Sequence, residues 1–297
     1  MKNLRNIVVA TDLSQHSRNA LLEAKRLAER RQAKLHVISV AGDTGLKELA
    51  DGLGTDFKGL RSGSTESIRG MLEDLVSETG IGDLECDLVT RIGDPYEEIL
   101  RLVNRTKAGM LVMGSKGTHH LRDGAGRTAI RCIRKLKAKV LLVRRAHAGP
   151  FKSVGAFVDF SKTSESAIKQ AAYIARADGA SLHLFRVYLP PWRVVHYGTP
   201  SRTYTPEAKE RYRDRVIGKM QDAMRCLREE SSDMQVDYSL IESSEKIIGI
   251  DDFIESTGVD IVVLNTRPRT GFRAVLLKTI AEHIIRTSPC SVLAVKS

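Results

Sequence analysis

The second half of this 297-residue chain repeats the first half, and residues 12–40 recur there at a constant offset of 147 residues. Ten of the twenty-nine positions from 12 to 40 carry the same residue in both halves, and no gap is needed to align them. The identical pairs include Asp12 with Asp159 and His36 with His183. A repeat of this length predicts one fold made twice, in two domains of about 150 residues each.

The boundary between the two copies is expected near Ala148–Phe151, where an Ala-Gly-Pro sequence breaks regular structure. We therefore predict domains at 1–148 and 149–297. No stretch of eighteen apolar residues occurs, so no membrane-spanning helix is expected, and the first residues carry no signal-peptide core. The four cysteines are far apart and show no CxxC spacing, which is typical of reduced thiols in a cytoplasmic protein.

Apolar runs and helical periodicity alternate along each half. Asn6–Ala10 is a continuous apolar run, typical of a strand in a sheet that is covered on both faces. Either Ser14 or Ser17 can cap the helix that follows, and a long polar connection precedes a helix expected at roughly 64–79. We predict an α/β fold in which each domain is a doubly wound, Rossmann-like parallel sheet of five strands with helices on both faces. Further strands are expected at 35–40, 87–91, 110–113 and 139–144, and then at 153–158, 182–188, 235–241, 260–264 and 291–296.

A glycine turn follows the expected strand Met110–Met113. Gly114 and Gly117 come directly after this strand, and a segment with helical periodicity opens near Thr128. Glycines let backbone amides approach a ligand closely, and a helix N-terminus presents unpaired N–H groups and positive dipole. The turn is therefore a candidate cradle for an anion such as phosphate. An ordinary strand-to-helix loop, in which the glycines only permit tight turning, explains the same residues.

Asp12 follows the first expected strand at the matching end of the sheet. Ligands of doubly wound sheets bind at the carboxyl ends of the strands, where the strand order reverses. If the first and fourth strands are neighbours, Asp12 and the turn at Gly114 face one crevice, and the carboxylate can bond to a polar ligand group. The alternative is that Asp12 caps the following helix together with Ser14, because Asp-Leu-Ser suits a strand-to-helix turn.

The net charge of +11 is uneven, with +8 in residues 1–149 and +3 in the remainder. Arg127, Arg131, Arg134 and Lys135 fall on one helical face, which nucleic acid, anionic lipid or an acidic partner could meet. No aromatic residues are interleaved with this stripe and no nucleic-acid motif accompanies it, so nucleic acid is not expected as a partner. We favour a solvated basic face that also steers an anion toward the turn at Gly114.

No residues are predicted to act as catalysts or metal ligands. His119 and His120 are adjacent on a loop, with no cysteine or carboxylate at ligand spacing beside them. The Gly-Ser-Lys-Gly sequence has the wrong spacing for a P-loop. Enzymatic activity is therefore at most a slow hydrolysis of a bound phosphate ligand, and no base for it stands out. The irregular segment 189–205 is expected to be a surface loop packed by its own aromatic residues, with Trp192 among them.

Several of these segments together resemble the universal stress protein family. They are VVATDLSQHSRNAL, the Gly-Asp-Pro at 93–95, VMGSKG and VLLVRR in the first half, and GAFVDFSKTSESAI and SPCSVLAVK in the second. The resemblance covers essentially the whole chain and therefore implies a tandem universal stress protein. It implies the strand order 3-2-1-4-5 in each domain, a cytoplasmic location, no general enzymatic activity and, in one branch, ATP binding. It also implies an intramolecular pseudo-dimer through the last strands, Val140–Val143 and Val292–Val295, or a homodimer.

The ATP-binding branch of that family carries a glycine, two residues, a second glycine, nine residues, a third glycine and then Ser or Thr. Gly114, Gly117 and Thr128 match three of these positions, whereas Arg127 replaces the third glycine. Arg127 could fill the phosphate space or bind phosphate with its guanidinium; alternatively, a one-residue slip brings Gly126 into place. The resemblance implies that ATP, accompanied by Mg²⁺, is held by Asp12 and the backbone of Val37 at adenosine, Met113 at the base, and Gly114, Gly117 and Thr128 at the phosphates. We expect Arg127 to contact a phosphate as well, because a bound anion offsets the cost of a cation at the start of a helix.

The second copy departs further from the motif. Asn265 and Pro268 align with Gly114 and Gly117, and proline removes an amide donor. Asp159 is retained, but the cradle is not, so the second domain is expected to be a structural or regulatory partner. The sequence therefore predicts one adenine nucleotide, in the first domain of a stress-response protein. The alternative function is association with other proteins, with the basic face meeting an anionic partner and no nucleotide bound.

Overall fold

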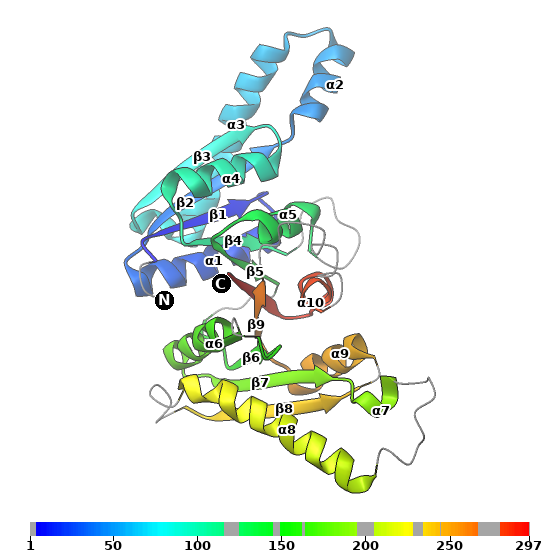
Figure 1. The fold of residues 1–297 in the computed structure, drawn as a ribbon. Helices are drawn as coiled ribbons and strands as arrows, with labels where there is room; N and C mark the ends of the chain where they lie inside the picture. Colours follow the sequence, from blue (N-terminus) through cyan, green and yellow to red (C-terminus); the bar gives the residue numbers. More distant parts are fainter. Residues whose placement is uncertain are drawn as a thin grey trace. The chain divides into compact units, whose positions relative to one another are not determined.

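The computed structural model describes residues 4–115, 125–144, 149–161, 164–194, 205–227, 234–243, 245–266 and 280–296. The chain divides into two compact units, Met1–Gly149 and Pro150–Ser297, called the first and second domains below. Each domain is a parallel sheet flanked by helices, which confirms the predicted fold class (Figure 1).

The first domain orders its strands β3-β2-β1-β4-β5, all parallel, as the family resemblance implies. The chain moves outward from β1 through β2 to β3, and then returns to the other side of β1 for β4 and β5. Helices α1 and α3 pack together, and α4 packs with α5 on the other face of the sheet (Figure 1). The elements are β1 (Asn6–Thr11), α1 (Gln15–Arg31), β2 (Lys34–Ala41), α2 (Asp43–Leu53), α3 (Phe57–Thr79), β3 (Cys86–Ile92), α4 (Pro95–Thr106), β4 (Met110–Gly114), α5 (Arg127–Lys135) and β5 (Lys139–Val143).

Local sequence explains where these elements begin. The strands β1 and β4 are buried along almost their whole length because helices cover both faces of the sheet. Of the two candidate caps for α1, Ser14 is the one used, and its side chain accepts a hydrogen bond from the Ser17 backbone N–H. Asp94 caps α4 in the same way, with Pro95 in the first turn.

The polar connection expected between β2 and the helix at 64–79 is largely helical. It contains the whole of α2 and the first turns of α3, so the helix expected at 64–79 begins seven residues earlier, at Phe57. These helices form a hairpin that extends away from the sheet of the first domain (Figure 1). The hairpin buries little apolar surface, and Leu49 and Leu53 remain 47% and 64% exposed. Because the hairpin has few buried apolar side chains and several glycines, its sequence shows no clear helical pattern.

The second domain repeats the topology, with strand order β8-β7-β6-β9-β10 and all strands parallel. Its core is richer in aromatic rings, since Phe185 stacks on Phe253 with centroids 4.3 Å apart. Trp192 packs edge-on against Tyr212 with centroids 5.3 Å apart. Tyr212 belongs to α8 and lies outside segment 189–205, so packing of that segment by its own aromatics stays a prediction. The elements are β6 (Ser153–Phe157), α6 (Ser164–Asp178), β7 (Ser181–Tyr188), α7 (Pro191–Val194), α8 (Pro206–Met224), β8 (Val236–Glu242), α9 (Lys246–Thr257), β9 (Ile261–Thr266), α10 (Ala281–Thr287) and β10 (Ser291–Lys296).

Among the described residues, no helix is long and apolar enough to cross a membrane. The four cysteines are all free thiols.

Candidate functional site

The carboxyl ends of β1 and β4 meet at the point where the strand order of the first domain reverses. These strands are direct neighbours, with Ala10 paired to Met113. Asp12 lies two residues beyond Ala10, and Gly114 lies one residue beyond Met113, so both belong to the same edge of the sheet. The condition set by the sequence, that the first and fourth strands be adjacent, is met. This edge is the usual ligand-binding position of a doubly wound sheet.

Asp12 organises a tight turn between β1 and α1. Its Oδ1 accepts hydrogen bonds from the backbone N–H of Ser14 at 3.2 Å and from the Ser14 hydroxyl at 2.6 Å. Between them, Leu13 adopts the left-handed conformation with φ of 63°, which is uncommon for a residue other than glycine. Asp12 therefore has the structural role anticipated from Asp-Leu-Ser, and it is also exposed at the carboxyl end of β1.

Met113 and Gly114 end β4 beside the start of α5. Met113 is buried, and Gly114 pairs with Val143 of β5. The next residue, Ser115, donates its N–H to the Val143 carbonyl at 3.1 Å and accepts the Gly126 N–H at 3.3 Å. The second bond joins the residue after β4 to the N-cap of α5, so α5 begins directly beside the end of β4. Gly117, His119 and His120 lie outside the described residues.

The N-terminus of α5 carries the features of an anion site. Gly126 is its N-cap, has no side chain to bond the first-turn amides, and is followed by no acidic residue in that turn. Arg127 and Thr128 are the first two helical residues; Arg127 is exposed and Thr128 half-buried. Within the described part of the chain, the Arg127 side chain has no ion pair or hydrogen bond. Uncapped amides, helix dipole and an added guanidinium all favour a negatively charged ligand.

Val37 lies further from this edge than the other expected site residues. It is buried in the middle of β2 and pairs with Val9 of β1 and with Leu88 of β3. Ser39, two residues further along β2, pairs with Thr11 at the end of β1. The part of β2 nearest to Asp12 is therefore the segment that begins at Ser39, and a contact of the Val37 backbone with a ligand stays a prediction.

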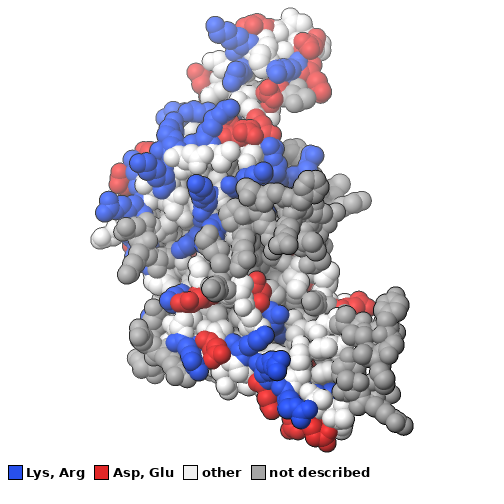
Figure 2. Space-filling view, in the orientation of Figure 1, with Lys and Arg blue, Asp and Glu red and all other residues white. Residues whose placement is uncertain are grey.

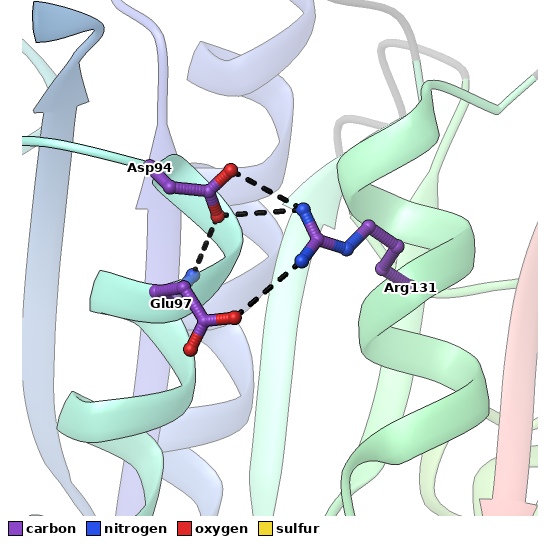
Figure 3. Close-up of polar contacts among 3 residues, drawn as sticks. All are labelled: Asp94, Glu97 and Arg131. Carbon is purple, nitrogen blue, oxygen red and sulfur yellow. Dashed lines mark hydrogen bonds and ion pairs between the residues drawn. The ribbon is translucent and has the colours of Figure 1, made fainter.

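A contact between α4 and α5 was not anticipated from the sequence. Arg131 places one terminal nitrogen 3.2 Å from Asp94 Oδ2 and the other 3.4 Å from Glu97 Oε1 (Figure 3). Its guanidinium also lies over the Tyr96 ring, 4.0 Å from the centroid. Acidic residues at a helix N-terminus are favourable by themselves, so the Asp-Pro-Tyr-Glu-Glu sequence hints at a cation partner without identifying it. The contact fixes α5 against α4, one helical turn beyond Arg127.

The basic stripe of α5 is therefore only partly a free positive surface. Arg131 is compensated by two carboxylates, whereas Arg127 has no acidic neighbour among the described residues. Figure 2 shows Lys and Arg side chains over the body of the first domain and both signs of charge on the α2–α3 hairpin. The cation nearest to the start of α5 is the one available to a ligand.

The described residues bring no three His, Cys, Asp or Glu side chains together in a way that could hold a metal ion. Burial raises the pKa of the Cys132 thiol in α5 to about 12, and that of Cys86 to about 11. These thiols are therefore protonated near neutral pH and are poor nucleophiles. The chemistry that this edge of the sheet offers is the binding of an anion by amides, a guanidinium and a hydroxyl.

The corresponding position of the second domain is described only in part. Asn265, which aligns with Gly114, lies near the end of β9 and pairs with Val295. Pro268, Lys278 and Thr279 lie outside the described residues.

The family model of the universal stress protein family matches the chain twice, at residues 3–144 and 150–296. The chain belongs to this family. No curated protein matches it by sequence. A universal stress protein from Archaeoglobus fulgidus shares the fold with a TM-score of 0.70 and 18% identity, and 99% of each chain is covered.

Two further structures extend the comparison. A chain described as a universal stress protein from Pseudomonas aeruginosa gives a TM-score of 0.67 at 16% identity, covering 99% of this chain and 93% of that one. A universal stress protein solved in complex with cAMP covers 50% of this chain and 98% of its own, at 15% identity and a TM-score of 0.37. That likeness shows neither a shared site nor a shared ligand. Two copies of the family domain, matched along the whole chain by solved structures, make this a tandem universal stress protein.

Proposed function

We propose that the first domain binds one adenine nucleotide, ATP, at the carboxyl ends of β1, β2 and β4. One observation carries the proposal: the uncapped start of α5, with Arg127 at its first position, is tied by Gly126 and Ser115 to the end of β4. This arrangement concentrates positive potential beside the exposed carboxylate of Asp12. A nucleotide is a ligand that presents both an anionic end and a polar sugar.

Each expected site residue has a role in this proposal. The phosphates are held by the first-turn amides of α5, by the Arg127 guanidinium and by the Thr128 hydroxyl. The Asp12 carboxylate accepts a hydrogen bond from the ribose, and Met113 contacts the base. Gly114 and Gly117 let the backbone between β4 and α5 approach the phosphates closely. The backbone of β2, from Val37 to Ser39, borders the adenosine.

Mg²⁺ enters this proposal with the phosphates, since no cluster of protein ligands for it occurs among the described residues. When bound, the nucleotide supplies negative charge that compensates Arg127 and the helix dipole. The nucleotide acts as a bound signal in this proposal, and its hydrolysis is at most slow. We assign the protein to the cytoplasmic stress response on this basis, with free thiols in keeping with a reducing compartment.

Calorimetric titration with ATP and Mg²⁺ tests the proposal and is expected to give about one site per chain. Gly117→Val is expected to weaken binding, because a β-branched side chain stands in the path of the phosphates. Gly63→Val is the matched control, since nothing lies within 4 Å of a side chain added there. Absence of both heat and thermal stabilisation at millimolar ATP would leave the alternative, a stress protein that acts through an anionic protein partner. Pairing of the two domains through their last strands stays a prediction.

A further inference from the structure

The second domain repeats the turn that Asp12 builds in the first. Asp159 Oδ1 accepts hydrogen bonds from the Ser161 backbone N–H at 2.9 Å and from the Ser164 hydroxyl. Phe160, between Asp159 and Ser161, is left-handed with φ of 55°, as Leu13 is in the first domain. The framework of a ligand crevice therefore exists twice in the chain, and the side chains that surround it decide what each copy can hold.

Arg186 distinguishes the second crevice. The repeat aligns it with Ser39, a small side chain that is 4% exposed at the end of β2. Arg186 donates a hydrogen bond from one terminal nitrogen to the Val158 carbonyl at 3.0 Å. Its guanidinium also lies over the Phe160 ring, 4.3 Å from the centroid. The side chain of Arg186 therefore crosses from β7 to the end of β6 and covers the turn.

The register of the sheet places this bridge beside the expected nucleoside position. Val158 continues the pairing of β6 with β7, since its N–H donates to the Phe185 carbonyl at 2.9 Å. Arg186 is thus level with the end of β6, as Ser39 is level with Thr11 in the first domain. In the first domain this space, between the end of β2 and the turn at Asp12, is where we place the adenosine.

The charges of the second crevice compensate one another. Burial tends to raise the pKa of the Asp159 carboxyl, but hydrogen bonds from Ser161 and Ser164 outweigh it, so its pKa lies below the usual value. Burial lowers the pKa of the Arg186 guanidinium from a very high ordinary value, and the negative charge of Asp159 opposes this shift. Asp159 is therefore ionised and Arg186 remains a cation at neutral pH, so the crevice carries both charges without a ligand.

We propose that Arg186 occupies the nucleoside position of the second domain, stacking on Phe160 and bonding to the Val158 carbonyl in place of a bound base. The inference rests on the proposed function for the location of the nucleoside. It makes residue 186 a specificity determinant: a small side chain at this register leaves room for adenosine, and an arginine fills it. One chain then offers one adenosine site although it contains two copies of the fold.

The experiment is a titration of the full chain with adenosine, which lacks phosphates, so its result does not depend on residues 267–279. Arg186→Ser, which installs the residue of the first domain, is expected to add one binding site to the number in the unaltered protein. Arg186→Met keeps a long side chain without the charge and is expected to add none. An unchanged stoichiometry in the serine variant overturns the proposal, and a gained site in the methionine variant overturns it as well, because volume would then not be the cause.

The proposed function and this inference fail differently. If the unaltered protein binds no adenosine but Arg186→Ser binds one, the first-domain site is lost and the inference stands. If the unaltered protein binds one adenosine and the serine variant also binds one, the first-domain site stands and the inference about Arg186 is wrong. A cooperative thermal melt verifies that each variant folds. Should Arg186→Ser not fold, a crystal of the unaltered protein soaked in millimolar adenosine decides: Arg186 on Phe160 with no adenosine there is expected, and adenosine in that place overturns the proposal.

Discussion

The two domains share a turn and differ in what surrounds it. In both, an aspartate bonds to a serine two residues later across a left-handed residue, Leu13 in one and Phe160 in the other. A left-handed conformation costs a residue with a side chain roughly 1 kcal/mol or more. In both domains the hydrogen bonds of the aspartate and serine stabilise the turn and offset this conformational cost. The side chain opposite the turn is Ser39 in the first domain and Arg186 in the second.

This difference separates the residues that make the fold from those that select a ligand. The aspartate and serine side chains build the connection between the first strand and the first helix, so they serve the fold of either domain. Position 39 and its counterpart 186 stand at the end of a strand, where the fold tolerates both a buried hydroxyl and a stacked guanidinium. A duplicated chain can therefore keep its architecture twice and its binding site once.

The largest effect is expected when the arginine of the second domain is introduced at position 39 of the first. Ser39→Arg is expected to weaken ATP binding at least tenfold, about 1.4 kcal/mol, because the guanidinium takes the space of the nucleoside. Titration calorimetry measures the effect. Ser39→Ala is the control for the lost hydroxyl and is expected to change affinity much less.

The double variant Leu13→Phe with Ser39→Arg supplies the ring on which the guanidinium stacks, as in the second domain. It is expected to fold as well as the unaltered protein and to lose ATP binding as fully as the single variant. Full ATP affinity in both arginine variants would show that the contrast between Ser39 and Arg186 does not control the ligand.

Substitution of Arg127 is expected to cause the next largest change in ATP affinity. The direction of that change shows whether Arg127 binds phosphate or obstructs the site. Arg127→Gly is expected to weaken ATP binding about fivefold, near 1 kcal/mol for a partly solvated guanidinium on phosphate, and to reduce the dependence on salt. Arg127→Lys keeps the charge and is expected to retain part of the affinity. Tighter binding by the glycine variant, which restores the family motif, would mean that Arg127 obstructs the site. The measurement is ATP affinity at two salt concentrations.

The parts of the fold that were predictable are those with strong local causes. Continuous apolar runs predicted the buried strands, and Asp94 followed by Pro95 marked the start of α4. The α2 helix was missed because only Ala50 of its described side chains is buried and glycines flank it at both ends. Tertiary packing, rather than propensity, decides such a segment.

Only those parts of the site that are formed by residues close together in the sequence could be predicted. The turn at Asp12 and the start of α5 follow from residues close in sequence. Arg131 finds Asp94 across 37 residues of chain, and Arg186 finds Val158 across 28, so neither contact leaves a local pattern. An arginine in a strand or on a helix usually indicates a solvated surface, and only the side-chain contacts in the structure show that these two are engaged.

The contact between the last two helices offers a further test on stability. In the first domain Arg131 joins α4 and α5, whereas in the second His283 Nε2 lies 2.8 Å from Asp251 Oδ2 between α9 and α10. Asp94→Ala removes both a helix cap and a half-exposed ion pair, and is expected to destabilise the protein by about 1–2 kcal/mol. Asp94→Asn keeps the cap and should cost less than about 1 kcal/mol. Urea unfolding measures both. No loss of stability in the asparagine variant would mean that the ion pair contributes nothing, and equal losses in the two variants would mean that the cap contributes nothing.

The smallest expected difference concerns acid sensitivity at His36 and His183, which occupy the same position in the repeat. Burial is the largest cause that lowers the pKa of each from the ordinary 6.5. His36 Nδ1 lies 3.1 Å from Asp87 Oδ2, and this carboxylate partly offsets the burial, although Lys34 acts against it. His183 bonds instead to the neutral Ser239 hydroxyl at 3.0 Å, and the charge of Asp237 raises its pKa by less than burial lowers it.

A histidine whose pKa is lower in the folded state binds protons more readily when the chain unfolds. Its contribution to stability is therefore complete above the unfolded value of 6.5 and is lost as the pH falls below it. Urea midpoints measured from about pH 7.5 to 5.5 should fall less steeply when His183 is replaced by Gln than when His36 is, since His36 has a carboxylate partner that stabilises its charged form. Asp87→Asn should remove that distinction by making the chain more acid-sensitive through His36. If replacing His36 and replacing His183 change the pH dependence equally in the unaltered background, Asp87 does not moderate the buried ring and the two histidines titrate alike despite their different partners.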